Sequence, residues 1–316
     1  MTSLRSLSPS TRKSLTVRRV RPTIVCFGEV MWDCVPRGLF LGGAPVNVAW
    51  HLCRQGVRAL PVTGIGRDFL GAEMRRRLIA GGVDLRFVTE TARWPTGTVQ
   101  ASLDDRGVPA FHIARGAAWD HIGPQPAIRG VSSPDAVIYG TLALREKPNR
   151  RSLAALLRAW PAAWRVVDLN LRPPFDTATA IDLVLGEAQL LKLNEHELAR
   201  LDGRSRSSPA GLEQSARRIA SRHGISRICV TAGDRGAGLL WDDDWRWESA
   251  RPAAVRDTIG AGDAFLAGLL AALLVRRQAP PQALMHACRM GEFVAARDGS
   301  MPLYHLNSRG QPREFK

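Results

Sequence analysis

Residues 257–268 read DTIGAGDAFLAG and run directly into the apolar segment AFLAGLLAALLV at 264–275. Gly260, Ala261 and Gly262 carry no bulky side chain, so the backbone N–H groups of this turn can converge on one point. A helix that begins here adds the positive end of its dipole at the same point. The stretch therefore predicts an anion site suited to phosphate, with a simple N-terminal cap on a core helix as the alternative.

The carboxylate of Asp263 falls in the first turn of that predicted helix. A carboxylate beside a bound phosphate can accept the proton of an attacking hydroxyl group, as it does in kinase active sites. The helix end favours the ionised form of Asp263, which keeps it ready but makes it a weak base. We therefore expect Asp263 to orient the hydroxyl group as much as to deprotonate it.

A second small-residue turn, GGAPVNVA at 42–49, also opens a predicted helix. Gly42 and Gly43 permit close approach of the backbone, and the Asn47 amide offers both a donor and an acceptor. Asp33, at the end of the first predicted strand, can accept hydrogen bonds from two adjacent hydroxyl groups. The turn and Asp33 together predict a polyol site, and a plain strand–turn–helix connection is the alternative.

Segments typical of strands and of helices alternate along most of the chain. Strands are predicted at 23–31, 58–66, 135–144, 164–172, 190–194, 226–233 and 236–242. Helices are predicted at 45–56, 68–82, 150–160, 180–188, 195–203, 212–224, 261–277 and 281–297. This alternation predicts an α/β, Rossmann-like fold in which helices cover both faces of a mostly parallel sheet.

The segment TGTVQASLDDRGVPAFHIAR at 96–115 breaks this alternation. Its apolar and polar residues alternate around DDRG, which is typical of a half-exposed hairpin. Together with residues near 34–42, we expect it to form a small β lid. Ligands of such sheets bind beyond the carboxyl ends of the strands, so polar residues at those ends, Glu29 and Asp33 among them, are candidates for the site.

Two further motifs lie at the ends of predicted strands. NEHE places Asn194 and Glu197 three residues apart in the first turn of a helix, where oxygen ligands can hold Mg²⁺ through water. An exposed polar helix start is the alternative. In DLNLR, period two puts Asp168, Asn170 and Arg172 on the same side of a strand, so that Arg172 can face phosphate or form an ion pair.

The stretch TAGDRGAG at 231–238 is a glycine-rich turn between two predicted strands. A nucleotide phosphate or ribose can approach such a backbone closely, and a lone hairpin turn is the alternative. The histidines show no spacing typical of metal ligands.

The chain of 316 residues has a formal charge of +15, and 45% of its residues are hydrophobic. Residues 1–21 hold six basic residues and no acidic one, so we expect a disordered basic leader; a nucleic-acid or membrane tail and a transit peptide are the alternatives. The leader lacks the apolar core of a secretory signal, and the run 264–275 is too short to cross a bilayer. Five cysteines without a CxxC pair indicate reduced thiols and a cytoplasmic protein.

Taken together and in this order, the motifs resemble those of the ribokinase-like (PfkB) family of carbohydrate kinases. GGAPVNVAWHLCRQG (42–56) is similar to the family's N-terminal glycine motif and DTIGAGDAFLAG (257–268) to its C-terminal motif, and the resemblance extends from about Thr23 to Pro302. It implies a kinase domain over residues 22–316 with a three-layer α/β/α fold and a small β lid. The implied activity is transfer of the γ-phosphoryl group of ATP to a sugar hydroxyl with Mg²⁺.

The resemblance also implies a role for each matching residue. Asp263 corresponds to the catalytic base, and the anion hole corresponds to Gly260, Ala261 and Gly262. The sugar side comprises Asp33, Gly42, Gly43 and Asn47, to which we add Arg172. The nucleotide side comprises Asn194, Thr231, Gly233 and Gly236, to which we add Lys192. Glu197 is tied to Mg²⁺ through water, and Asp257 to a monovalent cation, K⁺.

Details of the motifs favour fructose as the sugar. The first motif reads GGAPVN where ribokinases usually show a lysine, as in GGKGAN, and both GEVMWDCVP (28–36) and AWD (118–120) look similar to fructokinases. Ribose, 2-keto-3-deoxygluconate and a nucleoside are alternatives, as is a non-catalytic sugar sensor. We expect a sugar and ATP as partners, not nucleic acid or membrane, and a homodimer through the lid. His286, Asp298 and Ser300 depart from the residues common in relatives near the adenine and the cation.

Overall fold

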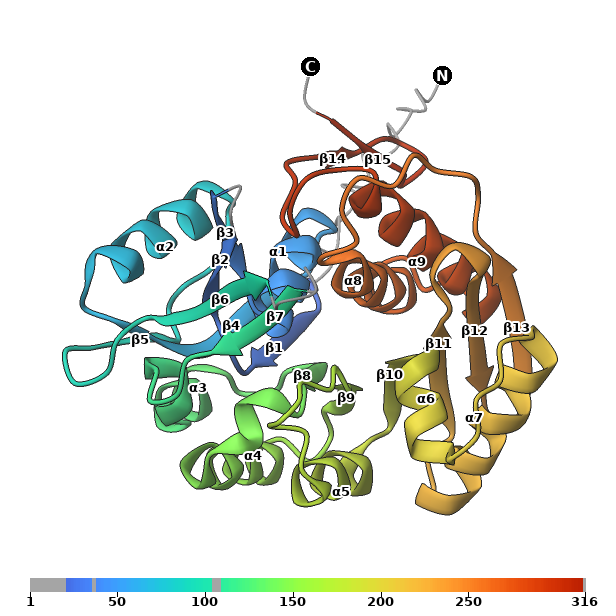
Figure 1. The fold of residues 1–316 in the computed structure, drawn as a ribbon, viewed down its shortest axis with the longest axis horizontal. Helices are drawn as coiled ribbons and strands as arrows, with labels where there is room; N and C mark the ends of the chain where they lie inside the picture. Colours follow the sequence, from blue (N-terminus) through green and yellow to red (C-terminus); the bar gives the residue numbers. More distant parts are fainter. Residues whose placement is uncertain (1–20, 36–37, 104–108, 315–316) are drawn as a thin grey trace, which may run out of the picture.

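A nine-stranded sheet runs through the middle of the protein, in the strand order β13-β12-β11-β10-β9-β8-β1-β4-β5 (Figure 1). The computed structural model describes residues 21–35, 38–103 and 109–314; the predicted leader, apart from Arg21, and the DDRG turn lie outside them. Neighbouring strands from β11 to β5 run parallel, and β12 and β13 add an antiparallel edge, which confirms the mostly parallel sheet. The strands are β1 (Thr23–Phe27), β4 (Arg58–Gly66), β5 (Val88–Thr91), β8 (Ala136–Tyr139), β9 (Trp164–Asp168), β10 (Leu190–Asn194), β11 (Arg227–Thr231), β12 (Gly236–Trp241) and β13 (Asp244–Ser249).

Helices cover both faces of this sheet, so the predicted three layers are present (Figure 1). One face carries α1 (Ala44–Arg54), α8 (Ala261–Leu274) and α9 (Pro280–Ala295). The other face carries α3 (Gln125–Gly130), α4 (Lys147–Ala159), α5 (Ala178–Glu187), α6 (Glu195–Asp202) and α7 (Pro209–His223). The central strands are apolar on both faces because each face packs against helices. Helix α8 is apolar on all sides because it lies between the sheet and its neighbours in the same buried cluster.

A second, four-stranded sheet projects beside the first, in the order β3-β2-β6-β7, and the helix α2 (Phe69–Ala80) lies next to it (Figure 1). Its strands are β2 (Met31–Val35), β3 (Gly38–Gly42), β6 (Gly97–Leu103) and β7 (Pro109–Ile113). The strands β6 and β7 pair antiparallel, as expected for a hairpin. The two segments predicted for the lid therefore contribute to one small sheet.

The predicted single strand at 23–31 is wrong, because the chain leaves the large sheet at Gly28. That glycine has a φ of 147°, which other residues rarely adopt. The chain turns there, so β1 belongs to the large sheet and β2 to the small one. The turn at Gly28 therefore brings the small sheet beside the carboxyl end of β1.

The predicted strand at 164–172 is also too long, and the placing of Asp168, Asn170 and Arg172 on one side of it is wrong. The strand β9 ends at Asp168, and Asn170 has a φ of 42°, in the left-handed region. Side chains alternate only in extended backbone, so period two does not apply beyond Asp168. Similarly, β8 ends at Tyr139 and a short 3₁₀ turn, Leu142–Arg145, replaces the end of the strand predicted at 135–144.

Several short elements were not predicted. They are the helix α3, the strands β5 and β13, the three-residue 3₁₀ turn Gly233–Arg235, the 3₁₀ turn Ala118–His121, and a ribbon of β14 (His305–Leu306) and β15 (Pro312–Arg313). All five cysteines are unpaired, as expected. Within the described ranges, no helix is long and apolar enough to cross a membrane.

Candidate active site

The two glycine-rich turns meet at the carboxyl end of the central strands. Gly43 precedes α1 and Gly260 precedes α8. Asn47, in the first turns of α1, donates a hydrogen bond of 2.7 Å from Nδ2 to Oδ2 of Asp263 in the first turn of α8, although 216 residues separate them. The turns that the sequence predicted for hydroxyl and phosphate binding therefore share one site.

The turn before α8 requires glycine at its first position. Gly260 has a φ of 78°, and a Cβ there would lie 2.4 Å from the Cβ of Ser300. The helix begins at Ala261, as predicted, and the backbone N–H of Ala261 donates to the carbonyl of Thr258. The first N–H groups of a helix have no acceptor within it, so Gly262 and Asp263 present theirs at this end. The turn therefore has the geometry of an anion site.

Burial, with a smaller contribution from the nearby Asp168 carboxylate, raises the pKa of Asp263 to about 6. Lys192 and the hydrogen bond from Asn47 act against this rise. The result differs from the sequence-based expectation, in which the helix end kept Asp263 a weak base. Desolvation outweighs the helix dipole here, so Asp263 is a stronger base than expected while still ionised at neutral pH.

A buried ion pair lies next to the start of α8. Lys192, in the middle of β10, donates from Nζ to both carboxylate oxygens of Asp168, at 2.9 and 3.1 Å. A Cβ on Gly262 would lie 2.9 Å from the same Nζ atom, so the ammonium group sits against the helix backbone. Burial lowers the pKa of Lys192, but the carboxylates of Asp168, Asp263 and Glu197 outweigh it and raise the pKa, so the side chain stays charged.

Asn194 and Glu197 form a reciprocal cap at the start of α6. Asn194 Oδ1 accepts from the backbone N–H of Glu197 at 2.9 Å, and Glu197 Oε2 accepts from the N–H of Asn194 at 2.8 Å. Glu197 Oε1 also accepts from the N–H of Leu171 at 2.8 Å. The alternative of an exposed polar helix start is wrong for Glu197, which is buried and ties the loop after β9 to α6.

The first glycine turn fits closely around two acidic residues. A Cβ on Gly42 would lie 2.4 Å from Oδ2 of Asp33, and a Cβ on Gly43 would lie 2.5 Å from the carbonyl oxygen of Glu29. Burial raises the pKa of Asp33 to about 6, although the Arg172 guanidinium acts against this rise. The structure thus brings Asp33, Gly42 and Gly43 together, and Arg172 lies close enough to influence Asp33, Glu29 and Asp263 alike.

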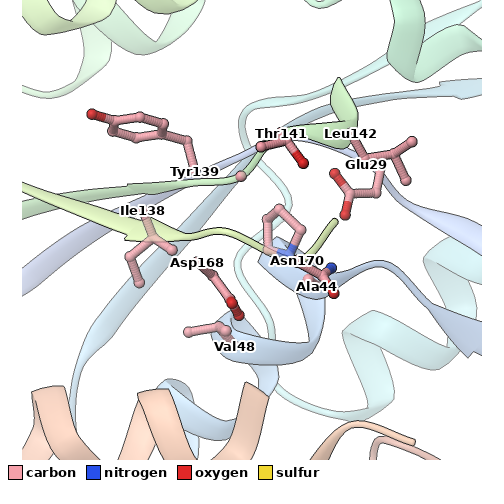
Figure 2. Close-up of a pocket in the computed structure, with 11 residues that line it drawn as sticks. Glu29, Ala44, Val48, Ile138, Tyr139, Thr141, Leu142, Asp168 and Asn170 are labelled. Carbon is pink, nitrogen blue, oxygen red and sulfur yellow. The ribbon is translucent and has the colours of Figure 1, made fainter. Parts of the chain in front are cut away.

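Glu29 is a site residue for which no role was predicted beyond its place at a strand end. It is 3% exposed, and its Oε2 atom has no hydrogen-bond partner among the described residues. Burial raises its pKa to about 7, more than Arg172 lowers it. Figure 2 shows Glu29, Thr141, Asp168 and Asn170 around a cavity of about 10 Å³, roughly the space of one water molecule.

Asp257 joins the loop before α8 to the segment after α9. Its carboxylate accepts from the backbone N–H of Ile259 at 3.0 Å and from that of Gly299 at 3.2 Å. Asp298, next to Gly299, forms an ion pair with Arg256 at 3.7 Å. The residue predicted for a monovalent cation is therefore buried at the junction of two loops.

The predicted nucleotide turn lies at the junction of β11 and β12. Thr231 ends β11, Gly233 is exposed in the short 3₁₀ turn, and Gly236 begins β12 with a φ of 126°. A Cβ on Gly236 would lie 2.1 Å from the carbonyl oxygen of Glu248, so packing against β13 requires glycine there.

His286, which departs from the residue common in relatives, lies on α9. Its Nε2 atom is 2.9 Å from Oε1 of Gln55, and this contact links α9 to the end of α1.

Residues 17–303 match the family model described as pfkB family carbohydrate kinase. A fructokinase of Klebsiella pneumoniae is 31% identical over 294 residues, which cover 87% of this chain and 93% of that protein. The crystal structure of a Vibrio cholerae fructokinase with fructose, ADP and calcium superposes with a TM-score of 0.78 at 24% identity, over 89% of this chain and 94% of that chain. An aminoimidazole riboside kinase of Salmonella enterica, with its riboside and an ATP analogue, gives 0.76 at 22% identity, over 88% and 95%.

Proposed function

The chain belongs to the pfkB family of carbohydrate kinases, and from that premise we propose that it transfers the γ-phosphoryl group of ATP to a hydroxyl group of fructose. The observation that carries the proposal is the 2.7 Å hydrogen bond between Asn47 and Asp263. It joins the turn suited to hydroxyl groups with the turn suited to phosphate. The similarity to a fructokinase of Klebsiella pneumoniae supports fructose as the acceptor.

The acceptor sugar is held in this proposal by Asp33, Gly42, Gly43, Asn47 and Arg172. The half-buried carboxylate of Asp33 lies over Gly42, where it can accept hydrogen bonds from two neighbouring hydroxyl groups. Hydroxyl donors would stabilise the ionised form of Asp33, which burial alone disfavours. A polyol is therefore a better ligand for this carboxylate than an apolar molecule.

Asp263 is the base in the proposed reaction. With a pKa raised to about 6 it is ionised at neutral pH and close enough to that pH to take a proton from the acceptor hydroxyl. The hydroxyl oxygen then bonds to the γ-phosphorus, the bond to the bridging oxygen breaks, and ADP leaves with the bonding electrons. In this proposal the turn formed by Gly260, Ala261 and Gly262 faces the negative charge on the transferred group with the Gly262 N–H, since the Ala261 N–H already donates to Thr258, and the Lys192 ammonium group adds a positive charge.

The nucleotide is held in this proposal by Lys192, Asn194, Thr231, Gly233 and Gly236. Three carboxylates, those of Asp168, Asp263 and Glu197, lie close enough to Lys192 to raise its pKa. This local excess of negative charge would repel ATP without a divalent cation.

We place Mg²⁺ at Glu197 through water and K⁺ at Asp257. Each Glu197 oxygen accepts one backbone hydrogen bond and keeps a further lone pair for a water molecule. No cluster of three or more histidine, cysteine or acidic residues among the described residues could hold a metal alone, so the phosphates of ATP would supply other ligands. Mg²⁺ would neutralise phosphate charge in the reaction.

A nucleoside acceptor is the second candidate, because a riboside kinase shares the fold at a TM-score of 0.76. The test is ATP turnover with fructose, ribose, 2-keto-3-deoxygluconate and a purine riboside, each with and without Mg²⁺ and K⁺. We expect the highest kcat/KM for fructose and loss of turnover without Mg²⁺. Faster turnover of another acceptor would replace fructose, and no turnover with any acceptor would favour a sugar sensor.

A further inference from the structure

A buried line of polar groups connects Asp263 to the small sheet. Asp263 Oδ2 accepts from Nδ2 of Asn47 at 2.7 Å, and the other end of that amide, Oδ1, lies 3.0 Å from the Ser300 hydroxyl. The same hydroxyl lies 3.0 Å from the carbonyl oxygen of Leu41 at the end of β3. Asn47 is 4% exposed and Ser300 is 2% exposed, so water does not compete readily for these bonds.

Ser300 is held firmly in this position. His51 Nε2 donates to the backbone carbonyl of Ser300 at 2.9 Å, and His51 Nδ1 accepts from the Tyr304 hydroxyl at 3.1 Å. Burial lowers the pKa of His51 to about 4, so its imidazole ring stays neutral, and keeps this tautomer, in the physiological pH range. Ser300 also packs against Gly260 at the start of the anion turn. Its hydroxyl can rotate, but its Cβ cannot easily move away.

The Ser300 hydroxyl has two acceptors within reach and only one hydrogen. When Asp263 is ionised, Asn47 must turn Nδ2 toward it, and Ser300 then donates to Oδ1 of Asn47. When Asp263 is protonated it can donate to Oδ1, the amide turns over, and Nδ2 donates to the Ser300 oxygen. The hydroxyl hydrogen is then available for the Leu41 carbonyl.

We propose that Ser300 is a positioning residue that couples the orientation of the Asn47 amide to the protonation of Asp263. Ser300 makes two hydrogen bonds in the protonated arrangement and one in the ionised arrangement. Its hydroxyl therefore favours the protonated form by about one hydrogen bond. The sequence marked Ser300 only as a departure from residues common in relatives, and the structure assigns it this contact.

Four other charged groups act on Asp263 and would be unchanged by a substitution at Ser300. The carboxylate of Asp168 raises its pKa, and the cations Lys192 and Arg172 lower it. Glu29 interacts with it electrostatically as well. None of these side chains is hydrogen-bonded to Ser300 in the described structure, so a shift in Ser300→Ala isolates the hydroxyl.

The experiment compares Ser300→Ala with the wild-type chain, and one readout needs no turnover. The ¹⁵N and ¹H chemical shifts of the Asn47 side-chain amide, assigned from their loss in Asn47→Asp, are followed from pH 4.5 to 8.5. We expect the titration midpoint to fall by about half a pH unit to one, the worth of one hydrogen bond. In the pH profile of kcat for the best acceptor sugar, the pH at which activity is half lost on the acid side should fall by the same amount.

Two variants separate this role from simple packing. Ser300→Thr keeps the hydroxyl and should keep the wild-type midpoint. Ser215→Ala removes another buried serine hydroxyl, bonded to Asp202 at 2.8 Å, and should leave the midpoint unchanged. An unmoved midpoint in Ser300→Ala, a shift to higher pH, or an equal shift in Ser215→Ala would overturn the proposal. The proposal rests on the proposed function only for the kinetic readout: absence of turnover with every acceptor would count against that function, while the amide titration would still decide the role of Ser300.

Discussion

The nucleotide side and the sugar side of the site differ in how their carboxylates are hydrogen-bonded, although burial raises the pKa of Glu197 on the nucleotide side as well. On the nucleotide side, Asp168 is paired with Lys192, and both oxygens of Glu197 accept backbone hydrogen bonds. On the sugar side, burial raises the pKa of Asp33 to about 6 and that of Glu29 to about 7. One Glu29 oxygen has no partner among the described residues.

The difference matches the chemistry of the two proposed ligands. A nucleotide brings negative charge, so the groups that meet it must be fixed and compensated before it arrives. A sugar brings neutral hydroxyl donors, so a carboxylate oxygen without a donor from the protein gains one when the sugar binds. The structure therefore leaves one oxygen of Glu29 without a donor among the described residues, which costs some stability, while Asp168 and Glu197 have donors on both oxygens.

Asp263 lies between the two sides, and its replacement should have the largest effect. We expect Asp263→Asn to lower kcat by about a thousandfold, within the range for loss of a general base, because no carboxylate remains to take the proton. The dissociation constant for the sugar should change by no more than about twofold. Steady-state kinetics and calorimetry measure the two, with exposed Asp244→Asn as the control. Turnover near the wild-type rate would exclude Asp263 as the base.

Removal of the paired cation tests the compensated side. Lys192→Met should destabilise the fold by about 3 kcal/mol, because it leaves Asp168 buried and charged without a partner. Asp168→Asn in the same chain should recover much of that loss. Urea unfolding at neutral pH measures it, and Arg246→Met, from an exposed pair with Asp244, should have an effect below about 1 kcal/mol. If Lys192→Met lost no more stability than Arg246→Met, Lys192 and Asp168 would not stabilise each other.

Removal of the Asp33 carboxylate tests the sugar side. Asp33→Ala should weaken sugar binding by about tenfold to a hundredfold, the worth of a hydrogen bond to a charged group, and leave ATP binding nearly unchanged. Calorimetric titrations with each ligand separate the two effects. If ATP binding weakened as much as sugar binding, the division of the site into two sides would be wrong.

Replacement of Glu29 should give the smallest of the four effects, a gain in stability that depends on pH. Its pKa of about 7 in the folded protein exceeds its ordinary value of 4.5, so the fold disfavours the ionised form. The penalty is present above about pH 7 and vanishes below about pH 4.5, where both states are protonated. The rise from 4.5 to about 7 corresponds to about 3 kcal/mol. The buried amide of Gln keeps part of that desolvation penalty, so Glu29→Gln should stabilise the protein by about 1 to 2 kcal/mol at pH 8 and by little at pH 4.5. Denaturant unfolding at the two pH values measures this, and a loss of stability at pH 8 would contradict the assigned pKa.

The regular elements were largely predictable, because their signals are local. The apolar run at 264–275 and the small residues before it predicted the first residue of α8 and placed its end three residues too late. The strand predicted at 23–31 failed because nothing in the local pattern shows that Gly28 turns the chain between two sheets. The strand β13 was missed although DWRWES alternates charged and aromatic residues with the period of two typical of a half-exposed edge strand, because the segment is only six residues long.

The sequence by itself determined which residue types stand at the strand ends and helix starts, and so the motifs around Asn47 and Asp263. Only the tertiary structure decided how they interact, since the two lie 216 residues apart. It also decided that Asp263 has a raised pKa, that one Glu29 oxygen has no partner in the described part of the chain and that Ser300 contacts the Asn47 amide. The physical reason is that desolvation and hydrogen bonding depend on neighbours in space, which packing alone supplies.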